Sequence, residues 1–161
     1  MGDRTPKSDF DPPYRQVKSD NPDKFDQETV AWQFCLLDRE HEHWGFNQLL
    51  PKQWRDLRNA LAGLEGLTWS AIKQAVGGRG TSGGTNHHSL DVRQICARAF
   101  KRLEELKLED IDAVFSLRIN NILRIYGIRD GRVFRLLWYD CHHDNKNAVY
   151  LTKKFRKRSD S

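Results

Sequence analysis

The pattern of apolar and polar residues in the first half of the chain predicts one strand followed by two helices. Residues 29–37, TVAWQFCLL, are rich in β-branched and aromatic side chains, as strands are. From Pro51 onward, apolar side chains recur every three or four residues, which predicts an amphipathic helix that ends at Gly66. Thr68 is suited to cap a second, shorter helix, and this helix should stop at Gly77.

The second half of the chain combines one long helical pattern with runs that alternate like strands. Residues 91–106 place Ile95 and Leu103 on one side and mostly charged side chains on the other, so this helix should pack on a sheet. Beyond it, the Asp130-Gly131 dipeptide predicts a two-residue turn between antiparallel strands. A two-residue turn fixes which residues of the two strands lie opposite each other, and side chains alternate between the two faces along each strand. One face then carries a set of apolar residues, which the helix at 91–106 should cover. The predicted set is Leu123, Ile125, Gly127, Phe134, Leu136 and Trp138.

The strand before this hairpin determines the composition of the opposite face. A two-residue Asn120-Asn121 turn would place Arg118 on the apolar face, which is costly. A three-residue loop over 120–122 instead sets Leu117 opposite Ile125 and leaves Arg118 outside. The predicted outer face of the sheet then displays Ser116, Arg118, Arg124, Tyr126, Arg135 and Tyr139.

These elements define an α+β fold. We expect an antiparallel sheet made of a C-terminal three- to four-stranded meander and an N-terminal strand, with the helices packed on one face. Residues 1–28 contain four of the five prolines, many aspartates and few aliphatic residues, which predicts a disordered N-terminal tail. Residues 29–152 should then form a single α+β domain, and residues 153–161 a basic C-terminal tail.

Composition argues against several classes of protein. No apolar run approaches the roughly 18 residues that a membrane span needs, and the N-terminus lacks the apolar core of a signal peptide. We therefore expect a cytoplasmic protein with no membrane partner. The cysteines Cys35, Cys96 and Cys141 form no CxxC pair, which predicts free thiols. The net charge of +5 suits a polyanionic partner, but such a charge also occurs on proteins that bind no nucleic acid.

Two motifs point toward cofactors, and both are better explained as surface features. The glycine-rich residues 77–86 lack the lysine that a Walker phosphate loop needs, because Gly84 occupies its position. Histidine pairs at 41 and 43, 87 and 88, and 142 and 143 lie near carboxylates, which invites a metal hypothesis. Adjacent histidines on a strand point to opposite sides, however, and zinc ligands usually come at set spacings from rigid elements. We therefore predict no metal and no cofactor.

The chemistry of the predicted outer face is that of a phosphate-binding surface. It carries arginines and no carboxylate before Asp140, and the planar fork of arginine matches phosphate oxygens, while tyrosine offers a ring for stacking. Alternatively, the arginines solvate this face or pair with Asp38, Glu40 or Asp140. The basic tail is either a solubilising end or an electrostatic contact to phosphates. The candidate nucleic-acid-binding residues are Arg118, Arg124, Arg129, Arg132, Arg135, Lys153, Lys154 and Arg156.

The order of the predicted elements and the sequence RIYGIRDGRVFRLLWYD at 124–140 resemble the small bacterial toxins of the RelE/ParE superfamily. The resemblance is strongest over residues 115–150, and residues 77–108 look like an insertion. It implies a basic concave surface and, for RelE-type members, cleavage of messenger RNA without a metal ion. It also implies two partners, namely RNA, including ribosome-bound messenger RNA, and an antitoxin protein.

Carried over by position, the resemblance implies catalytic roles for several residues. Arg124 and Arg135 would stabilise the phosphate, and Tyr126 or Tyr139 would donate a proton or stack on a base. His142, or its neighbour His143, would act as a general acid or base, because an ordinary histidine pKa makes both forms accessible at neutral pH.

Two hypotheses of different class follow. The first is a toxin-type, metal-independent endoribonuclease that works on the arginine and tyrosine face. The second is a non-catalytic module that binds nucleic acid or a protein partner, as an accessory or regulator in a bacterial conflict or mobile-element system. The meander has no lysine before Lys146, unlike the ribonucleases, and the ParE branch acts by binding a protein target. Both hypotheses need the same basic face, so the sequence leaves them both open.

Overall fold

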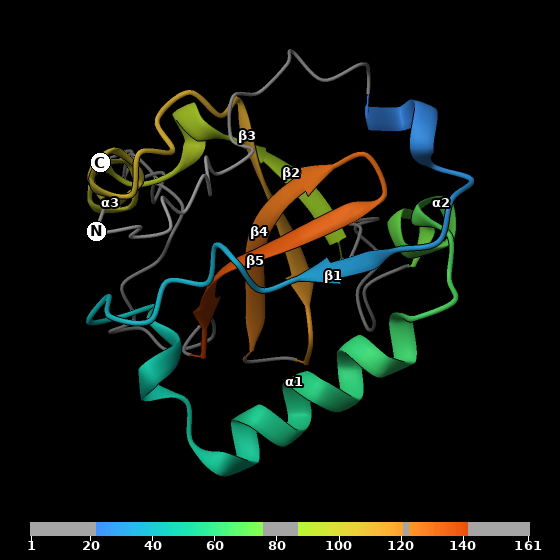
Figure 1. Ribbon diagram of the computed structural model, residues 1–161, viewed down its shortest axis with the longest axis horizontal. Coiled ribbons are helices and arrows are strands. Elements are labelled where there is room, and N and C mark those ends of the chain that lie inside the picture. Colours follow the sequence, from blue (N-terminus) through green and yellow to red (C-terminus); the bar gives the residue numbers. More distant parts are fainter. Residues whose placement is uncertain (1–21, 76–86, 121–122, 142–161) are drawn as a thin grey trace, which may run out of the picture.

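The strands of the predicted meander pair in the expected order. The computed structural model describes residues 22–75, 87–120 and 123–141 (Figure 1). Within them, five strands form one sheet in the order β1-β5-β4-β3-β2; β1 runs parallel to β5, and the other pairs are antiparallel. The strands are β1 (Ala31–Gln33), β2 (His87–Asp91), β3 (Ala113–Arg118), β4 (Arg124–Asp130) and β5 (Val133–Asp140). The predicted α+β fold, an antiparallel meander plus an N-terminal strand, is confirmed.

The first two helices begin where the sequence predicted. α1 (Pro51–Leu64) starts at a proline and is followed by Gly66, whose φ of +83° favours glycine. Before α2 (Trp69–Gln74), the Thr68 hydroxyl accepts a hydrogen bond from the N–H of Ala71 at 3.1 Å, which confirms the predicted cap. None of the helices in the described part of the chain is long and apolar enough to cross a membrane.

The third helix is shorter than predicted, because a strand and a short turn precede it. α3 spans Ala97–Glu105 rather than residues 91–106. His87–Asp91 form β2, and the Asp91 carboxylate then accepts a hydrogen bond from the N–H of Arg93 at 2.8 Å to begin a 3₁₀ turn. The polar HHSLD sequence does not alternate like a half-buried strand, so only its pairing with β3 identifies it as an edge strand. The glycine-rich residues 77–86 lie outside the described residues.

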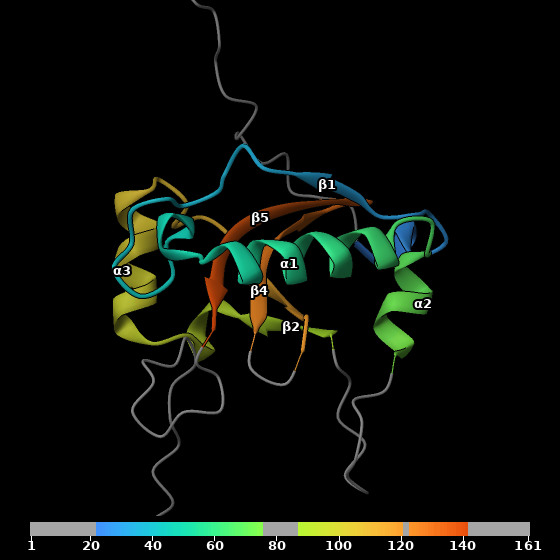
Figure 2. The ribbon, with the colours of Figure 1, turned by 90° about the horizontal axis from the view of Figure 1, so that it is seen from below.

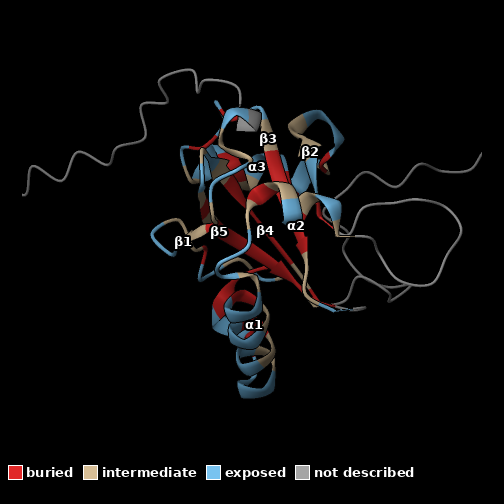
Figure 3. Ribbon diagram, turned by 90° about the vertical axis from the view of Figure 1, so that its right-hand side faces the viewer, coloured by how far each residue is buried: buried red, intermediate tan, exposed pale blue. Residues whose placement is uncertain are grey.

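The helices cover both faces of the sheet, not one face as predicted. α1 and α2 pack on one face of the sheet, and α3 packs on the other. In Figure 1, α1 lies below the sheet, α2 to its right and α3 at its upper left. The first core includes Leu57, Leu61, Trp69, Ile72, Leu123, Ile125, Phe134 and Leu136. The second includes Ile95, Ala99, Leu103, Tyr126, Ile128, Leu137 and Trp138. The central strands are accordingly buried from both sides, whereas the outer surface of α1 is exposed (Figure 3).

The turn of the β4–β5 hairpin is shifted by one residue from the prediction. Asp130 pairs with Val133, so the two turn residues are Gly131 and Arg132 rather than Asp130 and Gly131. Gly131 has a φ of +60°, and a tight hairpin turn of this length needs a positive φ at its first central residue. The glycine signal therefore located the turn, but it could not decide which of two neighbouring pairs would form it.

A β-bulge in the same hairpin reverses the predicted facing of the last residues of β5. The register shifts between Tyr126 and Gly127, which leaves Leu137 as an extra residue on β5. Leu137 and Trp138 therefore both lie in the core under α3, and Tyr139 lies in the core under α1. The prediction that Trp138 shares a face with Leu123, Ile125, Phe134 and Leu136 is wrong, although all five side chains are buried.

The β3–β4 register agrees with the prediction. Leu117 pairs with Ile125, and the N–H of Ile119 donates to the carbonyl of Leu123 at 2.9 Å. Arg118 pairs with Arg124 and stays off the face of the first core. The cost of placing a guanidinium among aliphatic side chains was thus sufficient to select this register.

The folded domain begins before residue 29. Asp26 forms ion pairs with Lys73 at 2.9 Å and with Arg129 at 2.7 Å, and its carbonyl accepts the N–H of Ser70 at 2.7 Å. Glu28 likewise accepts the N–H of Trp69 through its carbonyl at 3.0 Å. The predicted disorder is therefore wrong for residues 22–28, because single charges within a polar composition can be fixed by distant partners. Residues 1–21 lie outside the described part of the chain.

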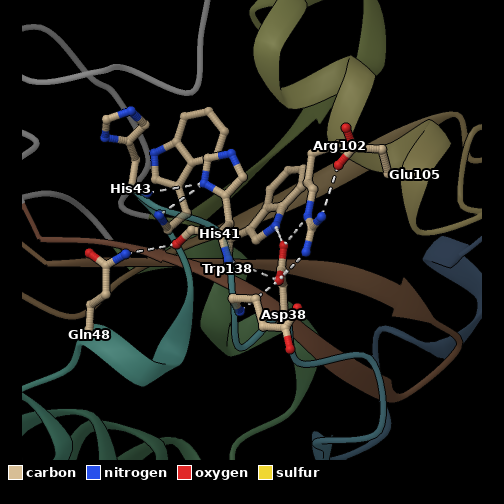
Figure 4. Close-up of polar contacts among 9 residues, drawn as sticks. Asp38, His41, His43, Gln48, Arg102, Glu105 and Trp138 are labelled. Carbon is tan, nitrogen blue, oxygen red and sulfur yellow. Dashed lines mark hydrogen bonds and ion pairs between the residues drawn. The ribbon is translucent and has the colours of Figure 1, made fainter.

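A buried carboxylate joins the loop after β1 to α3 and β5 (Figure 4). The Asp38 side chain is 1% exposed and receives two hydrogen bonds from Arg102, at 2.8 and 2.9 Å, and one from the indole of Trp138 at 2.9 Å. The N–H groups of Glu40 and His41 donate to the same carboxylate at 3.1 and 3.3 Å. Burial alone would raise the pKa of Asp38, but these donors outweigh it and lower the pKa to about 2.

The loop that follows Asp38 is organised by His41. Its Nδ1 accepts the N–H groups of His43 and Trp44 at 3.2 and 3.3 Å, and its ring stacks on the indole of Trp44 with centroids 4.5 Å apart. Trp44 in turn contacts Trp138 with ring centroids 5.5 Å apart. The predicted pairing of Asp38 with a meander arginine is wrong, because its partner is Arg102 from α3.

We predict that Asp38→Asn destabilises the fold by about 3 kcal/mol at neutral pH, because it leaves Arg102 without its buried partner. The depressed pKa of Asp38 adds stability that is present above its usual pKa of 3.8 and is lost as pH falls towards 2. The parent should lose about 2 kcal/mol more than the variant over that range. Urea unfolding of both proteins at pH 7 and pH 2.5 measures the free energy of unfolding at neutral pH and its loss in acid. An equal loss in the parent and in Asp38→Asn would contradict this role of the Asp38 carboxylate.

The contacts of Asp26 generate a second stability prediction. Asp26→Ala should reduce the free energy of unfolding by about 1–3 kcal/mol, because Arg129 and Lys73 both lose a charged hydrogen-bond partner. Glu28→Ala is the matched control, since that side chain is exposed, and it should stay within about 0.5 kcal/mol of the parent. Thermal unfolding of the three proteins tests this, and equal midpoints would mean that Asp26 contributes nothing to the fold.

Candidate nucleic-acid interface

The predicted outer face of arginines and tyrosines is not an open surface. Tyr126 is 2% exposed under α3, and its hydroxyl hydrogen-bonds with the buried Ser116. Tyr139 is also 2% exposed, and the bulge turns it to the opposite face, where its ring lies 5.5 Å from that of Phe46. The prediction that this face is solvated is wrong, because α3 packs against it. The alternation of residues within the hairpin does not reveal a helix that covers the face.

The burial of the two phenols determines their acid–base behaviour. Burial raises the pKa of Tyr139 to about 12, with smaller contributions from Cys141 and Asp140. Burial also raises the pKa of Tyr126, and Asp140 adds to this effect, whereas Arg124 opposes it. Both hydroxyls stay protonated at neutral pH, and neither lies where a scissile phosphate could reach it in this arrangement.

Three of the predicted arginines gather at the hairpin turn and bind other parts of the protein. Arg129 pairs with Asp26 at 2.7 Å, and its guanidinium lies 4.3 Å from the ring centroid of Trp69. Arg135 pairs with Asp130 at 2.9 Å and also donates to the side chain of Gln33 at 3.1 Å.

Arg132, the third arginine of this group, donates to the carbonyl of Thr29 at 3.0 Å. Arg135 of the predicted outer face thus pairs with a carboxylate, but with Asp130 and not with Asp38, Glu40 or Asp140, the partners that the alternative named. These contacts tie the N-terminal segment and β1 to the meander.

Arg118 and Arg124 lie at the other end of the hairpin, side by side on β3 and β4. They are register partners, and Arg124 is in turn the partner of Asp140 on β5, so the three residues form a row across the strands. The Nε of Arg118 donates to the carbonyl of Asn120 at 3.3 Å. Within the described residues, the half-buried Arg124 side chain makes no hydrogen bond or ion pair.

The electrostatic surroundings of Arg124 are unfavourable to its charge. Burial lowers the pKa of Arg124, and the charge of Arg118 lowers it further, whereas Tyr126 and Asp140 act in the opposite direction. An arginine nevertheless stays protonated under all ordinary conditions. Arg124 is thus a partly dehydrated cation beside a second cation.

The histidine pair at the start of β2 joins this end of the sheet. His87 pairs with Leu117 and His88 with Ser116, one strand away from Arg118. His87 is buried, and its Nδ1 accepts the N–H of Arg118 at 3.2 Å. Burial lowers the pKa of His87, and the charges of His88, Arg118 and Arg124 reinforce this, so the ring is neutral at neutral pH.

His88 is exposed on the side of Arg118, and we call Arg118, Arg124 and His88 the basic end of the sheet. Recognition of HHSLD as a strand would have revealed this neighbourhood from the sequence. Among the described residues, no group of three or more histidine, cysteine, aspartate or glutamate side chains could hold a metal ion. The basic end therefore offers guanidinium and imidazole groups to a ligand.

Several predicted site residues cannot be placed. His142 and the basic tail residues Lys153, Lys154 and Arg156 lie outside the described residues, and so does His143. Of the predicted set, the structure brings together Arg118 and Arg124, with the buried Tyr126 beneath them, and it separates both from Arg129, Arg132 and Arg135.

Comparison with known proteins finds no matching family model, no similar curated protein and no similar solved structure. The resemblance to the RelE/ParE superfamily therefore remains a prediction from the sequence.

Proposed function

We propose that this protein binds RNA through the phosphate groups of its backbone, at the basic end of the sheet. The observation that carries the proposal is the cross-strand pair of Arg118 and Arg124, two cations in direct register at the end of β3 and β4. RNA is the expected polymer because the meander resembles toxins that act on messenger RNA. The proposed partner is a nucleic acid, and no enzymatic step is part of the proposal.

Like charges placed directly opposite each other on adjacent strands destabilise a sheet. Burial of part of the Arg124 side chain adds to this cost, since no hydrogen bond from the described residues compensates it. An anion between the two guanidinium groups would neutralise both, and a phosphate offers oxygens that suit the arginine fork. A ligand of this chemistry explains why two arginines occupy these positions.

The contrast with the hairpin turn supports this assignment. Arg129 and Arg135 have carboxylate partners at 2.7 and 2.9 Å, and Arg132 is bonded to Thr29, so their guanidinium groups already have ligands within the fold. A phosphate would have to displace those contacts, several of which hold β1 and the N-terminal segment in place. At the basic end, the Arg124 side chain makes no such contact within the described residues, so a phosphate can bind it without displacing one.

Binding is better supported than cleavage by the residues at this end. The general acid of a metal-independent ribonuclease must come within hydrogen-bond reach of the reacting oxygen. Tyr126 is buried and already bonded to Ser116, and Tyr139 lies on the opposite face. We therefore propose a non-catalytic RNA-binding module, in preference to an endoribonuclease that uses these phenols.

Substitution of the two arginines tests the proposal. Arg118→Gln and Arg124→Gln should each weaken binding of a fluorescent RNA oligomer roughly tenfold, because each removes a charged hydrogen bond to phosphate. The slope of log affinity against log salt should fall by about 0.7 for each lost contact to a single strand. Arg132→Gln removes the same charge at the opposite end of the hairpin and should bind like the parent. Anisotropy titrations at several salt concentrations give both quantities.

A different ranking of these variants would contradict the assignment. If Arg132→Gln weakens binding as much as Arg124→Gln does, the contribution is one of net charge and the basic end is not the site. If neither arginine variant changes binding while both unfold more easily, Arg118 and Arg124 are structural residues.

The catalytic alternative has its own assay. Messenger RNA incubated with the purified protein in chelator, with and without ribosomes, should remain intact, because the described phenols cannot reach a phosphate. Gel analysis of the RNA measures this. Cleavage that Tyr126→Phe or Tyr139→Phe abolishes would show that the tyrosines act as proton donors and that the non-catalytic proposal is wrong.

A further inference from the structure

The outer surface of α1 presents a tryptophan to solvent. Trp54 is 40% exposed, whereas Trp44, Trp69 and Trp138 are buried. The preceding Leu50 is 64% exposed, so the apolar surface continues to the start of the helix. A side chain of this size is usually buried, and an exposed one marks a contact surface when other features agree.

The indole of Trp54 is supported from below by the core. Its ring lies 5.7 Å from that of Phe46 at an angle of 43°, and Phe46 packs against Tyr139 at 5.5 Å. One side of the indole is therefore held against buried rings while the rest faces outward. Binding at such a ring costs little conformational entropy, because the ring is already positioned.

Three exposed cations lie in the first two turns of the same helix. Lys52, Arg55 and Arg58 are exposed, and within the described residues none of their side chains makes a hydrogen bond or an ion pair. Arg58 lies one helical turn after Trp54, on the same side of α1. Asp56 is the one carboxylate in the helix, so the surface is basic as well as aromatic.

This surface and the basic end lie at the same end of the molecule. The thiol of Cys141, directly after β5, hydrogen-bonds with the side chain of Gln53, the neighbour of Trp54. Asp140, one residue earlier, is the register partner of Arg124. Figure 2 shows the N-terminal half of α1 beside the end of β5 and the start of β4. The end of β5 therefore lies between Trp54 on one face of the sheet and Arg124 on the other.

We infer that Trp54 is a stacking platform for an unpaired base of a single-stranded RNA, with the flanking phosphates on Arg55 and Arg58. The same strand then crosses the end of β5 to the basic end, so this inference rests on the proposed function and specifies its substrate as single-stranded. Alternation of an aromatic ring with cations is the chemistry by which proteins hold single strands.

Charge complementarity selects this occupant over a protein. A protein partner that covered Trp54 would also have to neutralise Arg58, one turn along the same side of α1, and the neighbouring Arg55 with acids at matching positions, whereas a sugar–phosphate backbone supplies an anion at every step. A duplex fits less well, because its bases are already stacked and their faces are not accessible to the indole.

The experiment compares three ligands of about 12 nucleotides, a length that such surfaces accommodate. They are a single-stranded RNA, an abasic strand of equal charge and an RNA duplex. Trp54→Leu should weaken binding of the single-stranded RNA on the order of tenfold to a hundredfold and leave the abasic strand unchanged. Trp54→Phe should retain most of the affinity. Phe100→Leu is the control, because Phe100 is an exposed aromatic, at 38%, on α3.

The outcomes separate this inference from the proposed function. If Arg124→Gln weakens binding but Trp54→Leu does not, the RNA-binding proposal stands and the stacking platform is wrong. An equal loss for the abasic strand would also overturn the inference, since no base is then involved. If sedimentation shows that the parent is a dimer and that Trp54→Leu dissociates it without changing RNA affinity, the surface is a protein interface and the inference fails. If the parent binds no RNA, both proposals fail.

Discussion

The buried carboxylate of Asp38 is the constraint from which much of this fold follows. An ion removed from water is costly unless a counter-ion and hydrogen bonds replace its hydration. Here the replacement comes from distant parts of the chain, because Arg102 belongs to α3 and Trp138 to β5. Both must converge on the loop after β1, so α3 is held on the face of the sheet toward which Trp138 points. The second core, under α3, is built on this face of the sheet.

The β-bulge in β5 makes that convergence compatible with the hairpin. Without it, Trp138 would face α1 and α2, as strict alternation predicts. Gly127 allows the irregularity, because a Cβ at this position would collide with the carbonyl of Arg135 and the ring of Phe134. The same bulge turns Tyr139 toward Phe46, and Phe46 supports the indole of Trp54. One extra residue thus buries the phenol of Tyr139 on the α1 side and connects the sheet to the aromatic surface of α1.

The arginines of the hairpin have divided roles because its two ends have different surroundings. At the turn, Asp26, Asp130 and Thr29 bind Arg129, Arg135 and Arg132, and these contacts close the N-terminal segment over the sheet. At the other end, Arg118 and Arg124 are register partners on the face of the sheet opposite α1, and the end of β5 lies between them and the start of α1. The proposed RNA-binding surface is therefore an end of the sheet and the adjoining helix, rather than a whole face.

The sequence by itself determined the local elements and the features whose physical cause is local. Pro51, Gly66 and Thr68 mark helix boundaries through their own backbone preferences, and the desolvation cost of Arg118 was enough to select the β3–β4 register. It also singled out Arg118 and Arg124, since the pattern of arginines in the hairpin is visible in the chain. What only the tertiary structure decided depends on groups that are distant in sequence. The strand at HHSLD exists through its pairing with β3, and the burial of Tyr126 depends on α3. The partners of Arg129 and Asp38 lie 103 and 64 residues away. Period-two alternation assigns side chains to opposite faces, but whether a face meets water, a helix or an ion is decided by packing across the whole chain.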